Sequence, residues 1–226
     1  MIPRILVINP NSATAVTQAL DLALQPLRVQ GGPAIDCATL AEGPPGIETQ
    51  AHVDAASGHV TAAIERQRAD AYVVACFSDP GVQTARERTS ALVFGIAECG
   101  MTSALALGTR FGILAILDQS IPRHLRQVEA LGLRARFAGD RAINIGVAGL
   151  ADEERTLSRL VQVGQSLRDS DGADVLVLGC AGMARYRVRV EEALGLPVID
   201  PTQAAVGLAR TALALGWHRQ PSFKES

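Results

Sequence analysis

Two segments of the chain repeat one pattern, a short apolar run that ends in a cysteine. Residues 69–76 read Ala-Asp-Ala-Tyr-Val-Val-Ala-Cys, and residues 173–180 read Ala-Asp-Val-Leu-Val-Leu-Gly-Cys. Small or turn-forming residues follow each cysteine. Apolar runs that do not alternate with polar residues are typical of parallel strands buried on both faces. Because such a strand occurs twice in matched surroundings, the sequence predicts a duplicated α/β chain.

Strands and helices alternate along the whole chain, and the cycle restarts near its middle. In the first half we predict strands at 4–8, 35–40, 71–76 and 93–96 and helices at 12–25, 48–68 and 82–88. In the second half we predict strands at 112–117, 134–138, 175–180 and 197–200 and helices at 101–107, 120–131, 152–169, 186–194 and 202–215. Asn11 or Ser12 is expected to cap the first helix.

This order predicts an α/β fold with two pseudo-symmetric lobes, each a mostly parallel sheet flanked by helices. We place the first lobe at residues 1–96 plus 201–226 and the second at residues 97–200. Open α/β sheets bind ligands at the carboxyl ends of their strands, and both cysteine loops fall at such ends. The active site is therefore expected in the cleft between the lobes.

Composition narrows the classes of function. The chain of 226 residues is 48% hydrophobic and 19% charged, with a formal net charge of −2, as in a well-buried globular protein. This balance offers no electrostatic surface for nucleic acid or for an anionic membrane. No apolar run approaches the roughly 18–20 residues of a membrane span, and the chain enters a strand without a signal peptide. We therefore expect a cytoplasmic protein whose partner is a small-molecule substrate.

The four cysteines occur without a Cys-x-x-Cys pair, so free thiols in a reducing compartment are expected. Cys37 and Cys99 lack the strand-end setting and are interpreted as structural. No metal site is predicted, because the histidines show no ligand spacing with the cysteines: His52, His59, His124 and His218. No Gly-x-Gly-x-x-Gly or P-loop motif supports nucleotide binding. Residues 179–182 resemble a nucleophile elbow in outline, without an identifiable His or Asp partner.

A buried cysteine is usually a small hydrophobic residue, but two cysteines in matching positions favour chemistry. We expect the helix start after each loop to lower the pKa of its thiol, which leaves one thiolate and one thiol near neutral pH. On opposite faces of a substrate, this pair can remove a proton from a carbon next to a carbonyl and return one from the other side. A delocalised carbanion held by hydrogen-bond donors needs no metal or organic cofactor. The predicted catalytic residues are Cys76 and Cys180, with no cofactor.

The groups that would hold this carbanion lie in loops at the same strand ends. Amides after the two cysteines are candidates, together with polar side chains from the loop after the first strand. The predicted substrate contacts are Asn9, Asn11, Ser12, Ile47, Phe77, Ser78, Ala181, Gly182 and Met183. Glu48 and Glu98 are interpreted as caps or surface groups, with a role at the cleft edge as the alternative.

Five segments that lie in order along the chain carry a family resemblance. They are Ile-Asn-Pro-Asn-Ser at 8–12, Gly-Pro-Pro-Gly-Ile-Glu at 43–48, Ala-Cys-Phe-Ser-Asp-Pro-Gly at 75–81, Gly-Ile-Ala-Glu at 95–98 and Leu-Gly-Cys-Ala-Gly-Met at 178–183. Together they resemble hydantoin racemases of the cofactor-independent aspartate/glutamate racemase superfamily. The resemblance implies a two-lobe fold, a homo-oligomer, and Cys76 and Cys180 as the acid and base on opposite faces of the substrate. It also implies a ring anion held by loop amides and polar side chains, best matched by Asn9 and Ser78.

One segment departs from the family pattern. After the strand that opens the second lobe, relatives commonly carry a Thr-Thr pair that faces the ligand. Here residues 112–118 read Gly-Ile-Leu-Ala-Ile-Leu-Asp, which removes two hydroxyls and places Asp118 nearby. The identity of the substrate is therefore left open.

The prediction is a cofactor-independent racemase of 5-substituted hydantoins or allantoin that transfers protons at the carbon next to a carbonyl. An aspartate/glutamate-type amino-acid racemase and a maleate-type isomerase stay open as alternatives. An amino acid would call for a cationic side chain to hold its carboxylate, and none is evident in the cleft loops. An arylmalonate-type decarboxylase is disfavoured, because it resembles the others but uses one catalytic cysteine. A non-catalytic ligand or redox sensor is the alternative from a different class.

Overall fold

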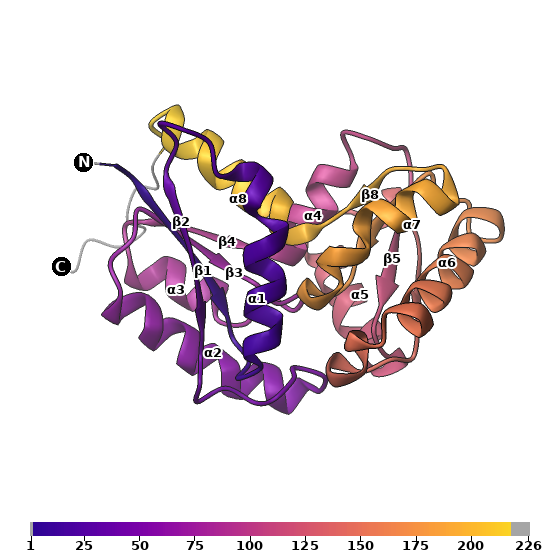
Figure 1. Cartoon of the computed structure of the whole chain (residues 1–226), viewed down its shortest axis with the longest axis horizontal. Coiled ribbons are helices and arrows are strands. Elements are labelled where there is room, and N and C mark those ends of the chain that lie inside the picture. Colours follow the sequence, from indigo (N-terminus) through magenta and orange to yellow (C-terminus); the bar gives the residue numbers. More distant parts are fainter. Residues whose placement is uncertain (1, 218–226) are drawn as a thin grey trace.

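Two four-stranded parallel sheets form the framework of the protein in the computed structural model, which describes residues 2–217 (Figure 1). The first sheet has the order β2-β1-β3-β4, with β1 (Arg4–Asn9), β2 (Ala34–Thr39), β3 (Ala71–Val74) and β4 (Leu92–Gly95). The second sheet has the equivalent order β6-β5-β7-β8, with β5 (Phe111–Ala115), β6 (Phe137–Ala142), β7 (Val175–Leu178) and β8 (Val198–Ile199). All neighbouring strands are parallel. The α/β fold with two pseudo-symmetric lobes is confirmed.

Helices cover both faces of each sheet, because the central strands are apolar on both faces. The helices are α1 (Thr14–Ala23), α2 (Gln50–Arg66), α3 (Val82–Arg88), α4 (Ile96–Ala104), α5 (Ile121–Ala130), α6 (Glu153–Asp169), α7 (Arg187–Leu194) and α8 (Pro201–Ala214). On the first sheet, α1 and α8 bury one face and α2 and α3 bury the other. On the second sheet, α6 and α7 bury one face and α4 and α5 bury the other.

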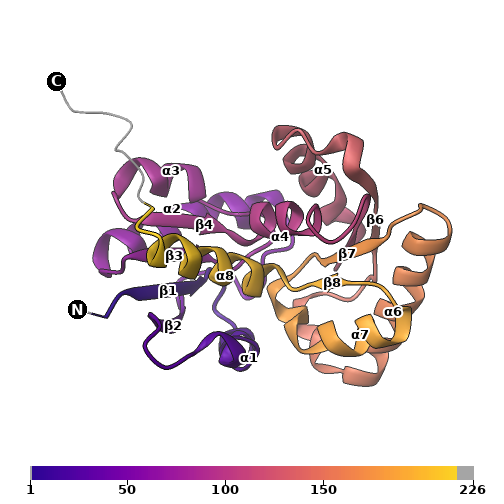
Figure 2. The same cartoon turned by 90° about the horizontal axis from the view of Figure 1, so that it is seen from above.

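The connections between the lobes cross over. Helix α4 follows the first sheet in sequence but packs on the second, and α8 follows the second sheet but packs on the first. The two helices lie side by side between the sheets (Figure 2). The exact residue boundaries proposed for the lobes stay a prediction, and residues 218–226 of the first lobe lie outside the described residues. Among residues 2–217, no helix is long and apolar enough to cross a membrane.

Most predicted elements differ from the observed ones by one or two residues at their ends, and two differ in kind or by several residues. The helix predicted at 101–107 begins at Ile96, because its first N–H groups find an acceptor in Asp79, far away in sequence. The segment predicted as a strand at 134–138 forms a 3₁₀ turn (Arg134–Arg136), and β6 follows it. Strand β6 lies at the sheet edge, where polar residues such as Asp140 and Arg141 are tolerated.

The start of α1 also differs from the prediction. Its N-cap is Ala13, and no side chain caps the helix. Asn11 instead closes a turn just before it, with Oδ1 accepting the Ala13 N–H at 2.9 Å. The loop before α1 is therefore shaped by asparagine contacts rather than by helix capping.

Candidate active site

The two predicted catalytic cysteines line one cavity at the carboxyl ends of the central strands. Cys76 lies two residues beyond β3, and Cys180 lies two residues beyond β7. The cavity has an empty volume of about 450 Å³, part of it open to solvent, and both cysteines are partly buried free thiols. Six of the predicted substrate contacts line the same cavity: Asn11, Ile47, Phe77, Ser78, Ala181 and Gly182. The structure thus brings eight of the eleven predicted site residues to one place.

Backbone hydrogen bonds hold each cysteine in a tight turn at its strand end. After Cys76 the chain turns back at once, because the Asp79 N–H donates to the Cys76 carbonyl at 2.9 Å. After Cys180 the chain forms a 3₁₀ helix (Ala181–Tyr186), in which the Met183 N–H donates to the Cys180 carbonyl at 3.1 Å. These turns direct backbone N–H groups toward the sulfur atoms.

Burial dominates the ionisation of the two thiols. It raises the pKa of Cys76 to about 12 and that of Cys180 to about 11, although hydrogen bonds from the N–H groups of Ser78 and Gly182 lower them. A charge on Cys180 would raise the pKa of Cys76 further, and Glu48 raises that of Cys180. Both thiols are therefore neutral near pH 7 in the free protein. The sequence-based expectation of one thiolate with a lowered pKa is wrong for this state.

Three predicted substrate contacts do not line the cavity. Asn9 is fully buried, and its Nδ2 donates to Asn11 Oδ1 and to Thr17 Oγ1, each at 3.0 Å. Ser12 donates its backbone N–H to a carbonyl of the loop before α2 at 3.0 Å. Met183 is fully buried in the core of the second lobe. Asn9 therefore holds Asn11 in place, and its predicted contact with substrate stays a prediction.

The N-terminal end of α5, together with its N-cap residue Ser120, contributes three cavity residues that the sequence did not reveal. Ser120, Arg123 and His124 have the i, i+3, i+4 spacing that places side chains on one helix face. Arg123 Nη2 donates to the Glu48 carbonyl at 2.9 Å and to the Ser120 hydroxyl at 3.2 Å, so it links the second lobe to the first. No cationic side chain was evident in the cleft loops, and the one at the cavity comes from helix α5 instead.

His124 forms a buried pair with an acid from β6. Its Nδ1 lies 2.7 Å from Asp140 Oδ2, and the two side chains are only 3% and 1% exposed. Phe77 meets the imidazole edge-on, with ring centroids 5.0 Å apart and an interplanar angle of 84°. Because Phe77 directly follows Cys76, the histidine packs against the first cysteine loop from the other lobe.

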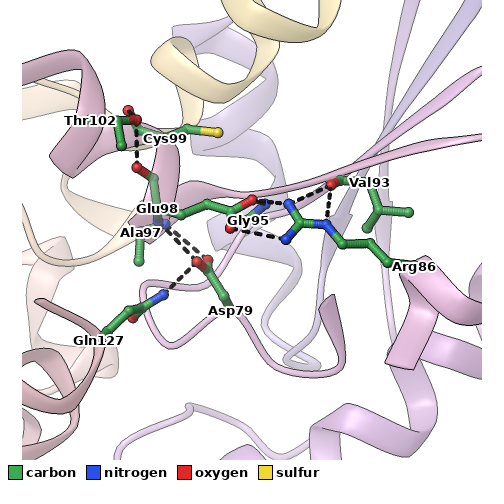
Figure 3. Close-up of polar contacts among 9 residues, drawn as sticks. All are labelled: Asp79, Arg86, Val93, Gly95, Ala97, Glu98, Cys99, Thr102 and Gln127. Carbon is green, nitrogen blue, oxygen red and sulfur yellow. Dashed lines mark hydrogen bonds and ion pairs between the residues drawn. The ribbon is translucent and has the colours of Figure 1, made fainter. Parts of the chain in front are cut away.

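The two glutamates singled out in the sequence have different positions. Glu98 caps α4, since its carboxylate accepts the Gly95 N–H at 3.2 Å and pairs with Arg86 (Figure 3). Glu48 lies at the cleft, where its Oε1 accepts the Val147 N–H of the second lobe at 2.9 Å. Glu98 is therefore a cap, and Glu48 is a bridge between the lobes.

The loop after the first cysteine is anchored by the carboxylate of Asp79 (Figure 3). This carboxylate accepts the N–H groups of Ala97 (2.9 Å) and Glu98 (3.0 Å) at the start of α4, and Gln127 Nε2 of α5 (2.6 Å). Burial raises its pKa to about 7, although these donors lower it. Gly95 is required beside it, because a Cβ atom there would lie 2.2 Å from the carboxyl carbon.

The remaining candidate ligands and thiols lie elsewhere. Cys37 belongs to β2 and Cys99 to α4, and neither lines the cavity. Within residues 2–217, no three His, Cys, Asp or Glu side chains are grouped so as to hold a metal ion. The chemistry available in the cavity is thus that of two thiols, backbone N–H donors and the polar end of α5.

Known proteins of similar sequence and structure share this framework. The family model described as Asp/Glu/Hydantoin racemase matches residues 5–209. Hydantoin racemase from Paenarthrobacter aurescens is 37% identical over 220 residues, which cover 95% of this chain and 92% of the relative. The structure of allantoin racemase from Klebsiella pneumoniae superimposes with a TM-score of 0.89 at 32% identity, covering 99% of this chain and 94% of that one. Allantoin racemase from Pseudomonas fluorescens gives a TM-score of 0.92 at 25% identity, with 99% of each chain covered. The chain therefore belongs to the Asp/Glu/Hydantoin racemase family and is a racemase.

Proposed function

We propose that the protein racemises 5-substituted hydantoins or allantoin by two-base proton transfer between Cys76 and Cys180. The observation that carries the proposal is that two thiols, from equivalent strand ends of the two lobes, line one cavity. Relatives named as hydantoin and allantoin racemases support the substrate class. A cytoplasmic homo-oligomer that works without metal or cofactor stays part of the prediction.

In this mechanism, the reactive form is the minor fraction of the enzyme in which one cysteine has lost its proton to solvent. The thiolate of that cysteine takes the proton from the carbon next to the ring carbonyl. The electron pair left on that carbon delocalises onto the carbonyl oxygen, and the thiol of the other cysteine gives its proton to the opposite face. The reverse direction exchanges the two roles. The N–H groups of Ser78 and Gly182 hydrogen-bond to the sulfur atoms, so they favour the thiolate formed at each step.

The test follows the proton and the stereocentre together in D₂O, by ¹H NMR and optical rotation, with an enantiopure 5-alkylhydantoin and with allantoin. We expect Cys76→Ser and Cys180→Ser each to lower the racemisation rate by about 10²- to 10⁴-fold, the usual contribution of a general acid or base. Cys37→Ser and Cys99→Ser are matched controls outside the cavity and should keep wild-type rates. Wild-type racemisation by either cavity variant contradicts the assignment.

One observation favours a second substrate class. The guanidinium of Arg123 lines the cavity and, within the described part of the chain, hydrogen-bonds only to carbonyl and hydroxyl oxygens rather than to a carboxylate. It is therefore available to hold the carboxylate of an amino acid. L-Aspartate and L-glutamate belong in the same NMR experiment, and exchange of their α-protons without exchange of the hydantoins would move the substrate to this class. A sensor would give no exchange with any of these compounds.

A further inference from the structure

We propose that His124 is a further catalytic residue, whose Nε2–H donates a hydrogen bond to the substrate carbonyl oxygen that gains negative charge. The proposal rests on the proposed function, because it concerns the same cavity and the same proton transfer. It deepens that function by naming the residue that would hydrogen-bond to the carbonyl oxygen on which the negative charge develops.

The position of His124 leaves one ring nitrogen for a ligand. The imidazole lines the cavity that contains Cys76 and Cys180. Its Nδ1 is occupied by Asp140 Oδ2 at 2.7 Å. Its Nε2 has no hydrogen-bond partner among residues 2–217, and it is not among the fully buried polar atoms that lack a partner. Because the imidazole lines the cavity, we infer that Nε2 is the nitrogen that a ligand there can reach.

Asp140 has little other support for a negative charge. Its side chain is 1% exposed, and its second oxygen, Oδ1, is buried without a hydrogen-bond partner in the described chain. Burial accordingly raises the pKa of this carboxyl, while His124 lowers it. An ionised carboxylate beside a neutral imidazole would leave one uncompensated charge in the interior, which is costly. The favoured states of the pair carry no net charge.

One uncharged arrangement puts the carboxyl proton on Oδ1 while Nδ1–H donates to Oδ2; it is disfavoured, because Oδ1 is buried with no partner in the described chain and its O–H would have no acceptor. Both remaining uncharged arrangements place a proton on Nε2. In one, Asp140 is ionised and His124 is an imidazolium, with protons on both nitrogens. In the other, the protonated carboxyl donates to Nδ1, and the neutral imidazole carries its proton on Nε2. In these two states His124 is a hydrogen-bond donor toward the cavity, and Asp140 holds it in that form.

A donor at this place suits the reaction. Removal of the proton at the substrate carbon moves charge onto the neighbouring carbonyl oxygen, and a preorganised donor stabilises that charge more than the ground-state carbonyl. The backbone N–H groups of Ser78 and Gly182 hydrogen-bond to the sulfurs, and a side-chain donor such as His124 can serve the carbonyl oxygen. Packing of Phe77 against the imidazole keeps its orientation tied to the Cys76 loop. No bond is made or broken at His124.

Two substitutions separate this role from a purely structural one. In His124→Gln the amide nitrogen falls near the position of Nε2, so the cavity donor is kept and the Asp140 contact is lost. In His124→Asn the amide nitrogen falls near Nδ1, so the Asp140 contact is kept and the cavity donor is lost. We expect kcat for hydantoin racemisation to fall about 10²- to 10³-fold in His124→Asn, as for loss of an oxyanion donor, and less than 10-fold in His124→Gln.

The opposite order, equal rates in the two variants, or wild-type rates in both would overturn the proposal. If either variant does not fold, as judged by thermal unfolding, ¹⁵N NMR of the wild-type histidines decides instead, with His124 assigned through its contact to Phe77. A proton on Nε2, and a change of that signal on adding a hydantoin, are expected; an unprotonated Nε2 overturns the proposal. A wild-type enzyme inactive on every hydantoin and on allantoin would instead be a failure of the proposed function.

Discussion

In the free protein, both cavity thiols should stay protonated well above neutral pH. The pKa is about 12 for Cys76 and about 11 for Cys180. At pH 8 the thiolate fractions are therefore about 10⁻⁴ for Cys76 and about 10⁻³ for Cys180. A cysteine with the ordinary pKa of 9.0 is about one-tenth ionised at this pH. Because the thiolate is the reactive form, ionisation alone slows alkylation by about 10³-fold at Cys76 and about 10²-fold at Cys180.

Alkylation with iodoacetamide, followed for each cysteine by peptide mass spectrometry from pH 6 to pH 10, measures this ionisation. We expect the rate at both cavity cysteines to rise about tenfold per pH unit without a plateau, with Cys180 ahead of Cys76. The chain unfolded in urea is the control, because there the same thiols ionise as ordinary cysteines. A plateau with a midpoint between pH 6 and pH 8 would refute the reasoning that burial outweighs the loop N–H donors.

The same ionisation couples to stability with a definite sign. A thiol whose pKa is raised on folding keeps its proton above pH 9.0, while the unfolded chain releases it, so stability falls as pH rises. Between pH 8 and pH 10, Cys76 should lower the free energy of unfolding by about 1.4 kcal/mol. Urea unfolding of the wild type and of Cys76→Ala should show a smaller alkaline loss in the variant. Equal losses would mean that Cys76 is not held neutral by burial.

Three substitutions test the supports of the site. In Asp79→Asn, the new NH₂ group faces at least one N–H of α4, so that N–H loses its acceptor. The free energy of unfolding at pH 5 should fall by about 1–3 kcal/mol. The difference should shrink at pH 8, because the wild-type carboxyl, with a pKa of about 7, then ionises in a buried place. Gly179→Ala puts a Cβ atom 2.7 Å from the Leu114 carbonyl oxygen, and should lower both the melting temperature and the racemisation rate. Tyr186→Phe removes the donor to the Leu150 carbonyl, and urea unfolding should show a loss of about 1–3 kcal/mol without loss of activity.

The central strands could be predicted because buried parallel strands read as nearly uniform apolar runs. The segments Ala71–Val74 and Val175–Leu178 are strands in the structure, and the cysteines that follow them share a cavity. The helix that begins at Ile96 was predicted to start later, because its first donors are satisfied by Asp79 from another segment. Local sequence carries no signal for an acceptor that the fold supplies.

The cavity residues at the start of α5, Ser120, Arg123 and His124, were not predicted for a related reason. His124 was considered only for metal ligand spacing, but its partner Asp140 comes from an edge strand whose polar residues obscured it. Spacing alone could have grouped Ser120, Arg123 and His124, since they share a helix face that starts just after a central strand. Spacing could not predict that His124 is buried at the cavity rather than exposed on the surface.

The two pseudo-symmetric lobes give their thiols unequal surroundings. Helices α4 and α8 follow the fourth strand of each sheet. The first N–H groups of α8 donate to its own N-cap Asp200, whereas those of α4 donate to Asp79 in the Cys76 loop, in addition to the cap that Glu98 provides. The Cys76 loop is therefore attached to the start of α4 by hydrogen bonds. The Cys180 loop has no equivalent role, because Asp200 lies outside it. If the enzyme racemises a substrate with one stereocentre, the equilibrium constant is one, so kcat/KM must be equal for the two enantiomers. A difference between the two bases can then appear only as a difference in kcat between the enantiomers that is matched by an equal ratio of their KM values.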